Sequence, residues 1–157
     1  MKNIKLILVL IVSLSLTSCG FKRVSQRFEE PINLKNVIIT GEKRISYTLK
    51  NNILLISDNA SENKYDARIK LKKKNNFKIK NETGKIIRYS LTMTADLELT
   101  NLKDNKKKQK LFISTVDYSV ASNHSDTINN EKNAMKSAIQ QLSDDIIVFI
   151  GFILKNK

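Results

Sequence analysis

The stretch IIRYSLTMTADLELTNL, residues 86–102, decides the fold because its apolar and polar side chains alternate without a break from Ile87 to Leu99. Successive side chains of a β-strand point to opposite faces of a sheet. The alternation therefore predicts a strand with one buried face and one face in water. The buried face would carry Tyr89, Leu91, Met93, Ala95, Leu97 and Leu99, and the wet face Arg88, Ser90, Thr92, Thr94, Asp96 and Glu98.

The segment before this strand predicts its hairpin partner. Residues 65–72 alternate in the same way, and Phe77 and Ile79 extend the pattern beyond a polar bend at 73–76. The sequence NETGK, residues 81–85, is typical of a turn, and its glycine can adopt a positive φ. We therefore expect an antiparallel pair joined at this turn.

Two more strands complete the predicted sheet. Residues 101–110 are predicted to form a very polar loop, and 111–120 to form the strand that follows it. Residues 32–40 contain a run of β-branched side chains at 37–39, which favours a buried strand.

Two segments have the spacing of amphipathic helices. Residues 42–57 place apolar side chains four, four and three positions apart, at Ile45, Leu49, Ile53 and Ile56. A longer helix is predicted after the polar stretch 122–130, with Asp126 or Thr127 as its N-cap. Its apolar stripe comprises Met135, Ala138, Ile139, Leu142, Ile146, Phe149, Ile150 and Ile153.

The last turns of this second helix, IIVFIGFIL at 146–154, are almost entirely apolar. They are too short to cross a bilayer, which takes about 20 apolar residues. Two interpretations stay open, a core helix or a surface for a partner or a lipid.

The predicted order is strand, helix, strand, strand, strand, helix. Each strand has one apolar face and each helix one apolar stripe, so the economical arrangement packs both helices on one face of the sheet. The predicted fold class is α+β, with a four-stranded, mostly antiparallel sheet.

The amino terminus has the layout of a signal peptide. Lys2 and Lys5 precede an apolar run at 6–12, and small residues lead to the one cysteine of the chain, Cys19. Leu16-Thr17-Ser18-Cys19 resembles a bacterial lipobox. That resemblance implies removal of residues 1–18, a thioether-linked diacylglycerol on Cys19 and acylation of the new amino terminus. Residues 19–31 would then be a lipidated tether and 32–157 a single domain.

The part of the chain from Cys19 onward is strongly basic. It keeps 26 Lys and Arg against 15 Asp and Glu, a net charge of +11. An excess of this size favours an anionic partner. For an exported lipoprotein, the anions at hand are membrane headgroups, above all those of lipopolysaccharide, and not nucleic acid.

The residues that enzymes use are scarce. The one histidine, His124, is predicted to lie in a polar loop, and four scattered glycines form no phosphate-binding loop. Asp144 and Asp145 are neighbours on a helix and do not converge on a metal or a substrate. We therefore expect no catalytic residues, no metal and no cofactor.

Several segments in order resemble the LPS-assembly lipoprotein family, LptE. They are CGF at 19–21, RISYTLKNNILL at 44–55, the central strand at 86–102, YSVASN at 118–123 and NAMKSAIQQLSDDI at 133–146. The resemblance implies an outer-membrane lipoprotein that binds one-to-one inside the LptD barrel, helps this barrel assemble and helps insert lipopolysaccharide into the outer leaflet. A different small lipoprotein, acting as a transport accessory or as a binding module for an anionic ligand, is the alternative.

Within this hypothesis, basic residues around the central strand would bind lipopolysaccharide. Arg88 lies where this strand starts, and the lysine run lies in the loop after it. We expect them to gather at one end of the sheet, where they would compete with divalent ions that bridge lipid phosphates or steer the lipid towards the barrel. The residues are Lys85, Arg88, Lys103, Lys106, Lys107, Lys108 and Lys110.

Overall fold

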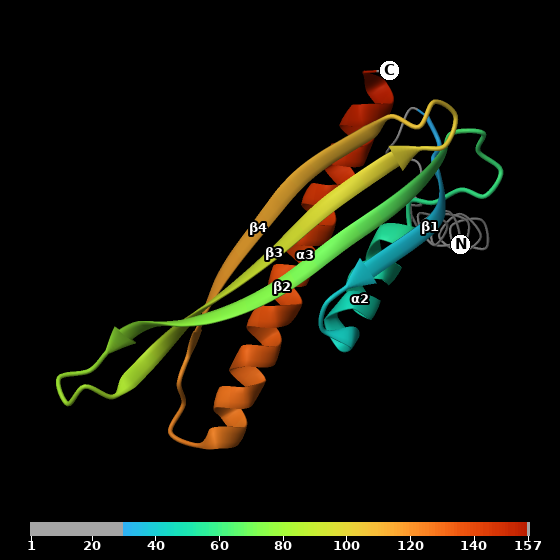
Figure 1. Cartoon of the computed structure of the whole chain (residues 1–157). Coiled ribbons are helices and arrows are strands. Elements are labelled where there is room, and N and C mark those ends of the chain that lie inside the picture. Colours follow the sequence, from blue (N-terminus) through green and yellow to red (C-terminus); the bar gives the residue numbers. More distant parts are fainter. Residues whose placement is uncertain (1–29, 157) are drawn as a thin grey trace, which may run out of the picture.

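Four strands form one sheet in chain order in the computed structural model, which describes residues 30–156. The predicted signal peptide, Cys19 and most of the predicted tether lie outside the described residues. The elements are β1 (Asn33–Thr40), α2 (Lys43–Leu54), β2 (Lys64–Lys80), β3 (Ile86–Asn101), β4 (Lys107–Ser119) and α3 (His124–Lys155) (Figure 1).

The order of the elements and the predicted fold class are confirmed. β2, β3 and β4 pair antiparallel through two hairpins, whereas β1 pairs parallel with β2. Neighbouring parallel strands need a crossover connection, and α2 supplies it. The sheet is therefore mixed but mostly antiparallel.

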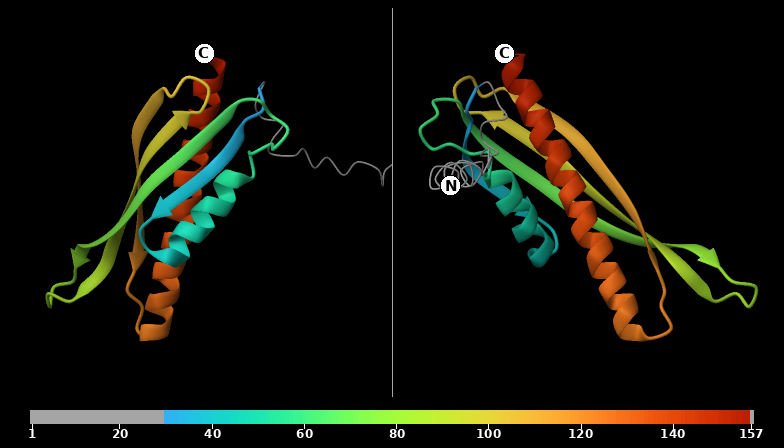
Figure 2. Two further views of the ribbon diagram at one scale, coloured as in Figure 1. Left: turned by 45° about the vertical axis from the view of Figure 1, so that its right-hand side comes forward. Right: turned by 180° about the vertical axis from the view of Figure 1, so that it is seen from behind.

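The core lies between the sheet and its two helices. The predicted apolar face of β3 is buried along Leu91, Met93, Ala95, Leu97 and Leu99. Both helices cover this face and leave the opposite one open (Figure 2). They also touch each other, because the side-chain amide of Asn52 in α2 donates a hydrogen bond to Ser143 Oγ in α3 at 3.1 Å.

α2 ends at Leu54, earlier than the predicted 57. The next residues leave the helix because they pair with residues 32–34, where β1 starts. Ile56 is fully buried, Ser57 forms a bridge with Ile32, and Ser57 Oγ accepts a hydrogen bond from the backbone N–H of Leu34 at 2.9 Å.

The two hairpins are longer than predicted. β2 runs straight through 73–76, so the predicted polar bend is wrong; Lys74 lies opposite Thr92 and Asn75 opposite Leu91. The predicted turn is confirmed, with φ +79° at Gly84.

The predicted loop at 101–110 is wrong in half of its length, at 101 and 107–110. β4 already begins at Lys107, which leaves 102–106 as a short turn. Pairing with β3 outweighs the low strand propensity of these polar residues, because strand propensity depends mostly on neighbouring strands.

α3 begins at His124, before the predicted start. Its N-cap is Asn123, whose side-chain oxygen accepts the N–H of Asp126 at 2.7 Å, and not Asp126 or Thr127. His124 is therefore an exposed residue of the first helical turn and not a loop residue.

Candidate functional site

The seven basic residues predicted to form one cluster lie at two opposite ends of the sheet. Lys85 and Arg88 lie where β3 starts, with Arg88 opposite Ser119 of β4. At the far end of β3, Thr100 lies opposite Lys107. A strand rises about 3.3 Å per residue, so the two groups are about 40 Å apart. The prediction of a single cluster is wrong because the whole length of β3 separates its members.

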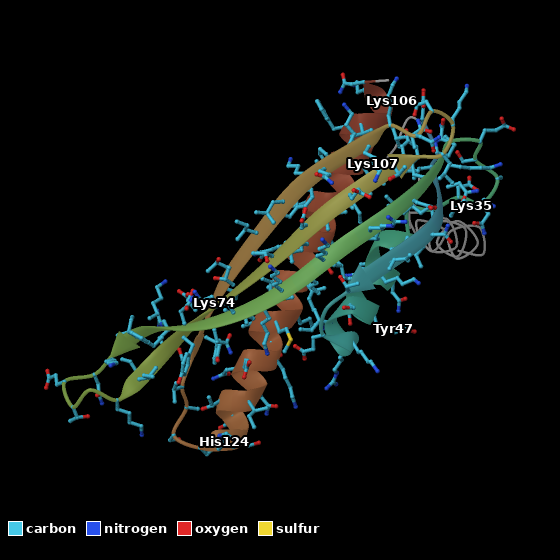
Figure 3. All side chains as sticks on the ribbon, viewed as in Figure 1. Lys35, Tyr47, Lys74, Lys106, Lys107 and His124 are labelled. Atoms are coloured by element: carbon cyan, nitrogen blue, oxygen red, sulfur yellow. The ribbon has the colours of Figure 1, made fainter. Side chains whose placement is uncertain are left out.

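One end of the molecule, which we call the C-terminal pole, is formed by the turn 102–106, the end of α3 and the start of the described chain. The backbone N–H of Leu102 donates to the carbonyl of Lys64 at 2.9 Å, and the side chain of Asn63 donates to the carbonyl of Pro31 at 3.1 Å. Figure 3 shows Lys106 and Lys107 at this pole and Lys74 well away from it. The opposite end is the hairpin tip, residues 77–88.

The lysines of the C-terminal pole point to both faces of the sheet. Lys107 lies on the open face, where its ammonium group is 3.2 Å from Glu98 Oε1. Lys110 is paired with Leu97 and lies on the helix side. Its nitrogen is 5.2 Å from the centre of the Phe112 ring and 4.7 Å from that of Phe149.

Two of these lysines are paired with carboxylates. Glu98 accepts hydrogen bonds from Gln109 at 2.9 Å and from Lys107, and Arg68 lies 3.9 Å away. These hydrogen bonds lower the pKa of Glu98, the one from Gln109 most and the one from Lys107 next. Asp104 pairs with Lys106 at 3.0 Å, which lowers the pKa of Asp104. Lys103 and Lys108 have no ion pair within residues 30–156.

A pocket of about 840 Å³ opens at the C-terminal pole. Its apolar wall consists of Tyr65, Leu99, Phe149, Phe152 and Ile153. Burial, aided by the nearby Asp104 and Glu30 carboxylates, raises the pKa of Tyr65. The charged part of the lining consists of Lys103, Lys106, Lys108, Asp104 and Glu62. The pocket thus combines an aromatic wall with a mixed, mainly cationic rim.

The hairpin tip contains the other two predicted residues, Lys85 and Arg88, whose neighbours differ from those at the C-terminal pole. Lys85 and Arg88 are exposed there, together with Phe77, which is 64% exposed. Lys80 lies over the Phe77 ring at 5.0 Å, and Lys78 pairs with Asp117 of β4, whose pKa this hydrogen bond lowers.

A third basic group lies on the open face and was not among the predicted site residues. Arg68, Lys70, Lys72 and Lys74 alternate along β2 and all point away from the helices. Lys72 and Lys74 lie opposite Thr94 and Thr92, so no carboxylate faces them across the strand pair. The alternation that predicted the strand was the signal for this row.

α3 has the length and composition of a membrane span. Its buried side chains nevertheless pack in the core at Ile146, Ile150 and Leu154, as the core-helix interpretation expects. The surface interpretation also finds support, since Val148 and Phe152 of the same turns are 71% and 64% exposed.

The described residues 30–156 contain no cluster of metal-binding side chains. No three His, Cys, Asp or Glu side chains there could hold a metal ion. His124 is exposed at the start of α3, and Asp144 accepts a hydrogen bond from Gln140 of its own helix at 3.1 Å.

These features define a class of protein: a small α+β domain with two helices on one face of its sheet, an open charged face and two basic ends. The family model that matches this chain, LptE or lipopolysaccharide-assembly, aligns with residues 29–149. The chain belongs to this family, which is not a family of enzymes.

Solved structures share the fold. Rare lipoprotein B from Shewanella oneidensis is 12% identical, with a TM-score of 0.61 over 78% of this chain and 98% of that one. A putative lipoprotein from Caulobacter crescentus is 17% identical, with a TM-score of 0.55 over 80% and 91%. Lipoprotein B from Nitrosomonas europaea is 19% identical, with a TM-score of 0.52 over 87% and 96%. The comparison with curated proteins finds no match.

Proposed function

We propose that this protein is an outer-membrane lipoprotein that plugs the LptD barrel, supports its assembly and helps insert lipopolysaccharide into the outer leaflet. The observation that carries the proposal is the family match over residues 29–149. Three of the solved structures with this fold bear the word lipoprotein in their descriptions, which supports an anchored protein.

The anchor in this proposal is a lipid on Cys19. Residues 1–18 are the signal peptide, and residues 19–31 connect the lipid to a domain that spans 32–157. The described chain starts at the C-terminal pole, so this pole is the end of the domain attached to the membrane.

The plug in this proposal uses the open face of the sheet. Strands β3 and β4 present a stripe of threonines there, with Thr92 and Thr115 hydrogen-bonded at 3.3 Å. Leu111 and Ile113 of β4 are more than half exposed on the same face. This β3–β4 part of the open face, beside the basic row on β2, suits close contact with the inner wall of a barrel, because its threonines, Leu111 and Ile113 lose less side-chain entropy on ordering than lysines or arginines would.

Lipopolysaccharide in this proposal binds to basic residues at both ends of the domain. One group is Lys85 with Arg88 at the hairpin tip, and the other comprises Lys103, Lys106, Lys107, Lys108 and Lys110 at the C-terminal pole. Ammonium and guanidinium groups replace divalent ions at the lipid phosphates. Each contact contributes about 1.5–3 kcal/mol where it is desolvated and much less where it stays in water.

Gentle detergent extraction of a tagged chain from its native outer membrane tests the proposal. We expect a large β-barrel to co-purify in a one-to-one ratio, together with lipopolysaccharide. A Cys19→Ser variant, which lacks the lipid, should lose its outer-membrane location and recover less barrel. Purification of the lipoprotein alone, or with an inner-membrane transporter, would contradict the plug and favour an accessory or anion-binding lipoprotein.

A further inference from the structure

Large apolar side chains are exposed at the C-terminal pole. Phe152 is 64% exposed although it belongs to the apolar turns of α3, and Leu102 in the β3–β4 turn is 41% exposed. Val148 lies one turn before Phe152 on the same side of α3 and is 71% exposed. Scattered exposed apolar residues need no explanation, but an apolar group with a basic rim indicates an interaction surface.

Cations border this apolar group. Lys103 directly follows Leu102, and Lys103, Lys108 and Phe152 all line the same pocket. Lys103 and Lys108 have no ion pair among the described residues, whereas Lys106 is paired with Asp104. Aromatic side chains flanked by lysines are typical of surfaces that lie in the interface of an anionic membrane.

The chain outside the described residues joins the molecule at this same pole. Pro31 is held there by the side chain of Asn63, and Asn63 also lines the pocket. Only residues 20–29 separate the predicted lipid on Cys19 from Glu30. A fully extended chain reaches about 3.5 Å per residue, so the tether keeps the C-terminal pole within roughly 40 Å of the bilayer.

We propose that the C-terminal pole docks onto the anionic phospholipid surface to which the chain is anchored. Phe152 enters the interface between headgroups and acyl chains, and Lys103 and Lys108 contact phosphates beside it. The hairpin tip points away from the bilayer. The inference rests on the lipid anchor of the proposed function, but not on the barrel.

The chain contains no tryptophan, so a single Trp reports on one site. Phe152→Trp places the probe at the C-terminal pole. Phe77→Trp is a matched control, because Phe77 is also a phenylalanine and also 64% exposed but lies at the hairpin tip. Each lipidated full-length variant is reconstituted into phosphatidylglycerol-containing vesicles whose acyl chains carry bromine, which quenches tryptophan on contact.

We expect the Phe152→Trp variant to emit at shorter wavelength and to be strongly quenched, and the Phe77→Trp variant to show neither effect. Equal quenching of the two, or quenching of the Phe77→Trp variant alone, would overturn the inference. So would quenching of the Phe152→Trp variant that appears only after lipopolysaccharide is added. Flotation of the protein with the vesicles tests the lipid anchor separately. A variant that floats with the vesicles but is not quenched would refute docking. A variant that does not float would refute the anchor and, with it, the docking that depends on the anchor.

Substitution of the lysines provides a second test of the docking. A basic residue near an anionic surface contributes about a fivefold shift in binding. Lys103→Ser with Lys108→Ser in the Phe152→Trp background should therefore lower the ratio of docked to undocked protein about 25-fold at low salt. Lys72→Ser with Lys74→Ser, on the open face, is the matched charge control and should leave the quenching unchanged. An equal loss in both double variants would indicate a general charge effect and would overturn the role of this pole.

Discussion

The ammonium nitrogen of Lys110 lies 4.7 Å from the centre of the Phe149 ring and joins β4 to α3. The aromatic faces of Phe149 and Phe112 attract the cation, and the two rings themselves pack edge to face at 5.7 Å. Lys110 therefore contributes to the packing of the helix on the sheet, and it lies in β4 and not in a loop.

Replacing Lys110 by Ser should destabilise the domain. A cation–π contact at an exposed site contributes about 0.5–1 kcal/mol, and Lys110 also covers the two rings with its methylenes. The midpoint of urea unfolding should fall accordingly. Lys85→Ser at the hairpin tip removes the same charge without a ring contact and should leave the midpoint unchanged; equal effects would contradict the packing role.

Replacing Leu97 by Asp should unfold the domain. Leu97 lies at 0% exposure in β3, and a carboxylate buried there costs about 4 kcal/mol or more, a large share of the stability of a small domain. Loss of the near-ultraviolet circular dichroism signal would show it. The same change at Leu111, which is 57% exposed on the open face, is the control and should be tolerated. A normal melting curve for Leu97→Asp would overturn the assignment of the buried face.

Gly41→Ala should be more harmful than Gly84→Ala. Both glycines have positive φ, +139° and +79°, but a Cβ at Gly41 would lie 2.5 Å from the carbonyl oxygen of Leu71, whereas open space surrounds Gly84. We expect a loss of about 1 kcal/mol at Gly84 and about 3 kcal/mol at Gly41, measured as free energies of unfolding. The reverse order would mean that the turn at 81–85 limits stability more than the junction of β1 and α2.

The stabilising effect of Glu98 should depend on pH. Hydrogen bonds from Gln109 and Lys107 lower the pKa of this carboxyl group below its usual 4.5 in the folded state. The contribution of Glu98 to the free energy of unfolding is therefore complete above pH 4.5, and it disappears as the pH falls through the lower pKa of the folded state. Glu98→Gln should lower the urea midpoint at pH 7, and the difference from the unmodified chain should vanish in strong acid. A constant difference at all pH values would contradict this account.

The two groups of predicted basic residues should act independently in lipopolysaccharide binding. Each exposed charge contact contributes about 0.5 kcal/mol, so replacing Lys106, Lys107 and Lys108 together by Ser should weaken binding roughly tenfold at low salt and less at high salt. Lys132→Ser with Lys136→Ser removes charge from exposed positions of α3 and is the control. Unchanged binding of the triple variant at both salt concentrations would remove the C-terminal pole from the site.

Replacing Lys85 and Arg88 by Ser tests the second group. If the two ends are separate sites about 40 Å apart, the effects of this pair and of the triple variant should add. Strong coupling between them would contradict two independent contacts with lipopolysaccharide.

Much of the fold could be predicted from short-range patterns. The alternation around Leu97 identified β3 and its buried side, and the stripe of Ile45, Leu49 and Ile53 identified α2 with its core-facing side. Both patterns repeat within a few residues, because side-chain direction follows the local backbone period. The ordered segments that resemble LptE were likewise visible without coordinates, and the family match confirms that resemblance.

The polar stretches were predictable only in part. The lysines and asparagines at 73–76 are typical of a bend, and those at 101–110 are typical of a loop, because no apolar residues alternate with them. Residues 73–76 and 107–110 nevertheless belong to strands, because β3 is long enough to pair with both segments. Backbone hydrogen bonds between strands are formed whatever the side chains, provided that the two strands are in register.

The sequence by itself therefore determined which side chains are buried, the order of the elements and the family. Only the tertiary structure decided where the charged side chains lie. Arg88 and Lys107 are at opposite ends of β3, and Lys107 faces water while Lys110 faces Phe149. The tertiary structure also decided that the end of α3 forms a pocket beside the turn 102–106. Side-chain periodicity is a local property of the backbone. The distance between two charges depends on strand length and on the register between strands, and long-range pairing fixes both.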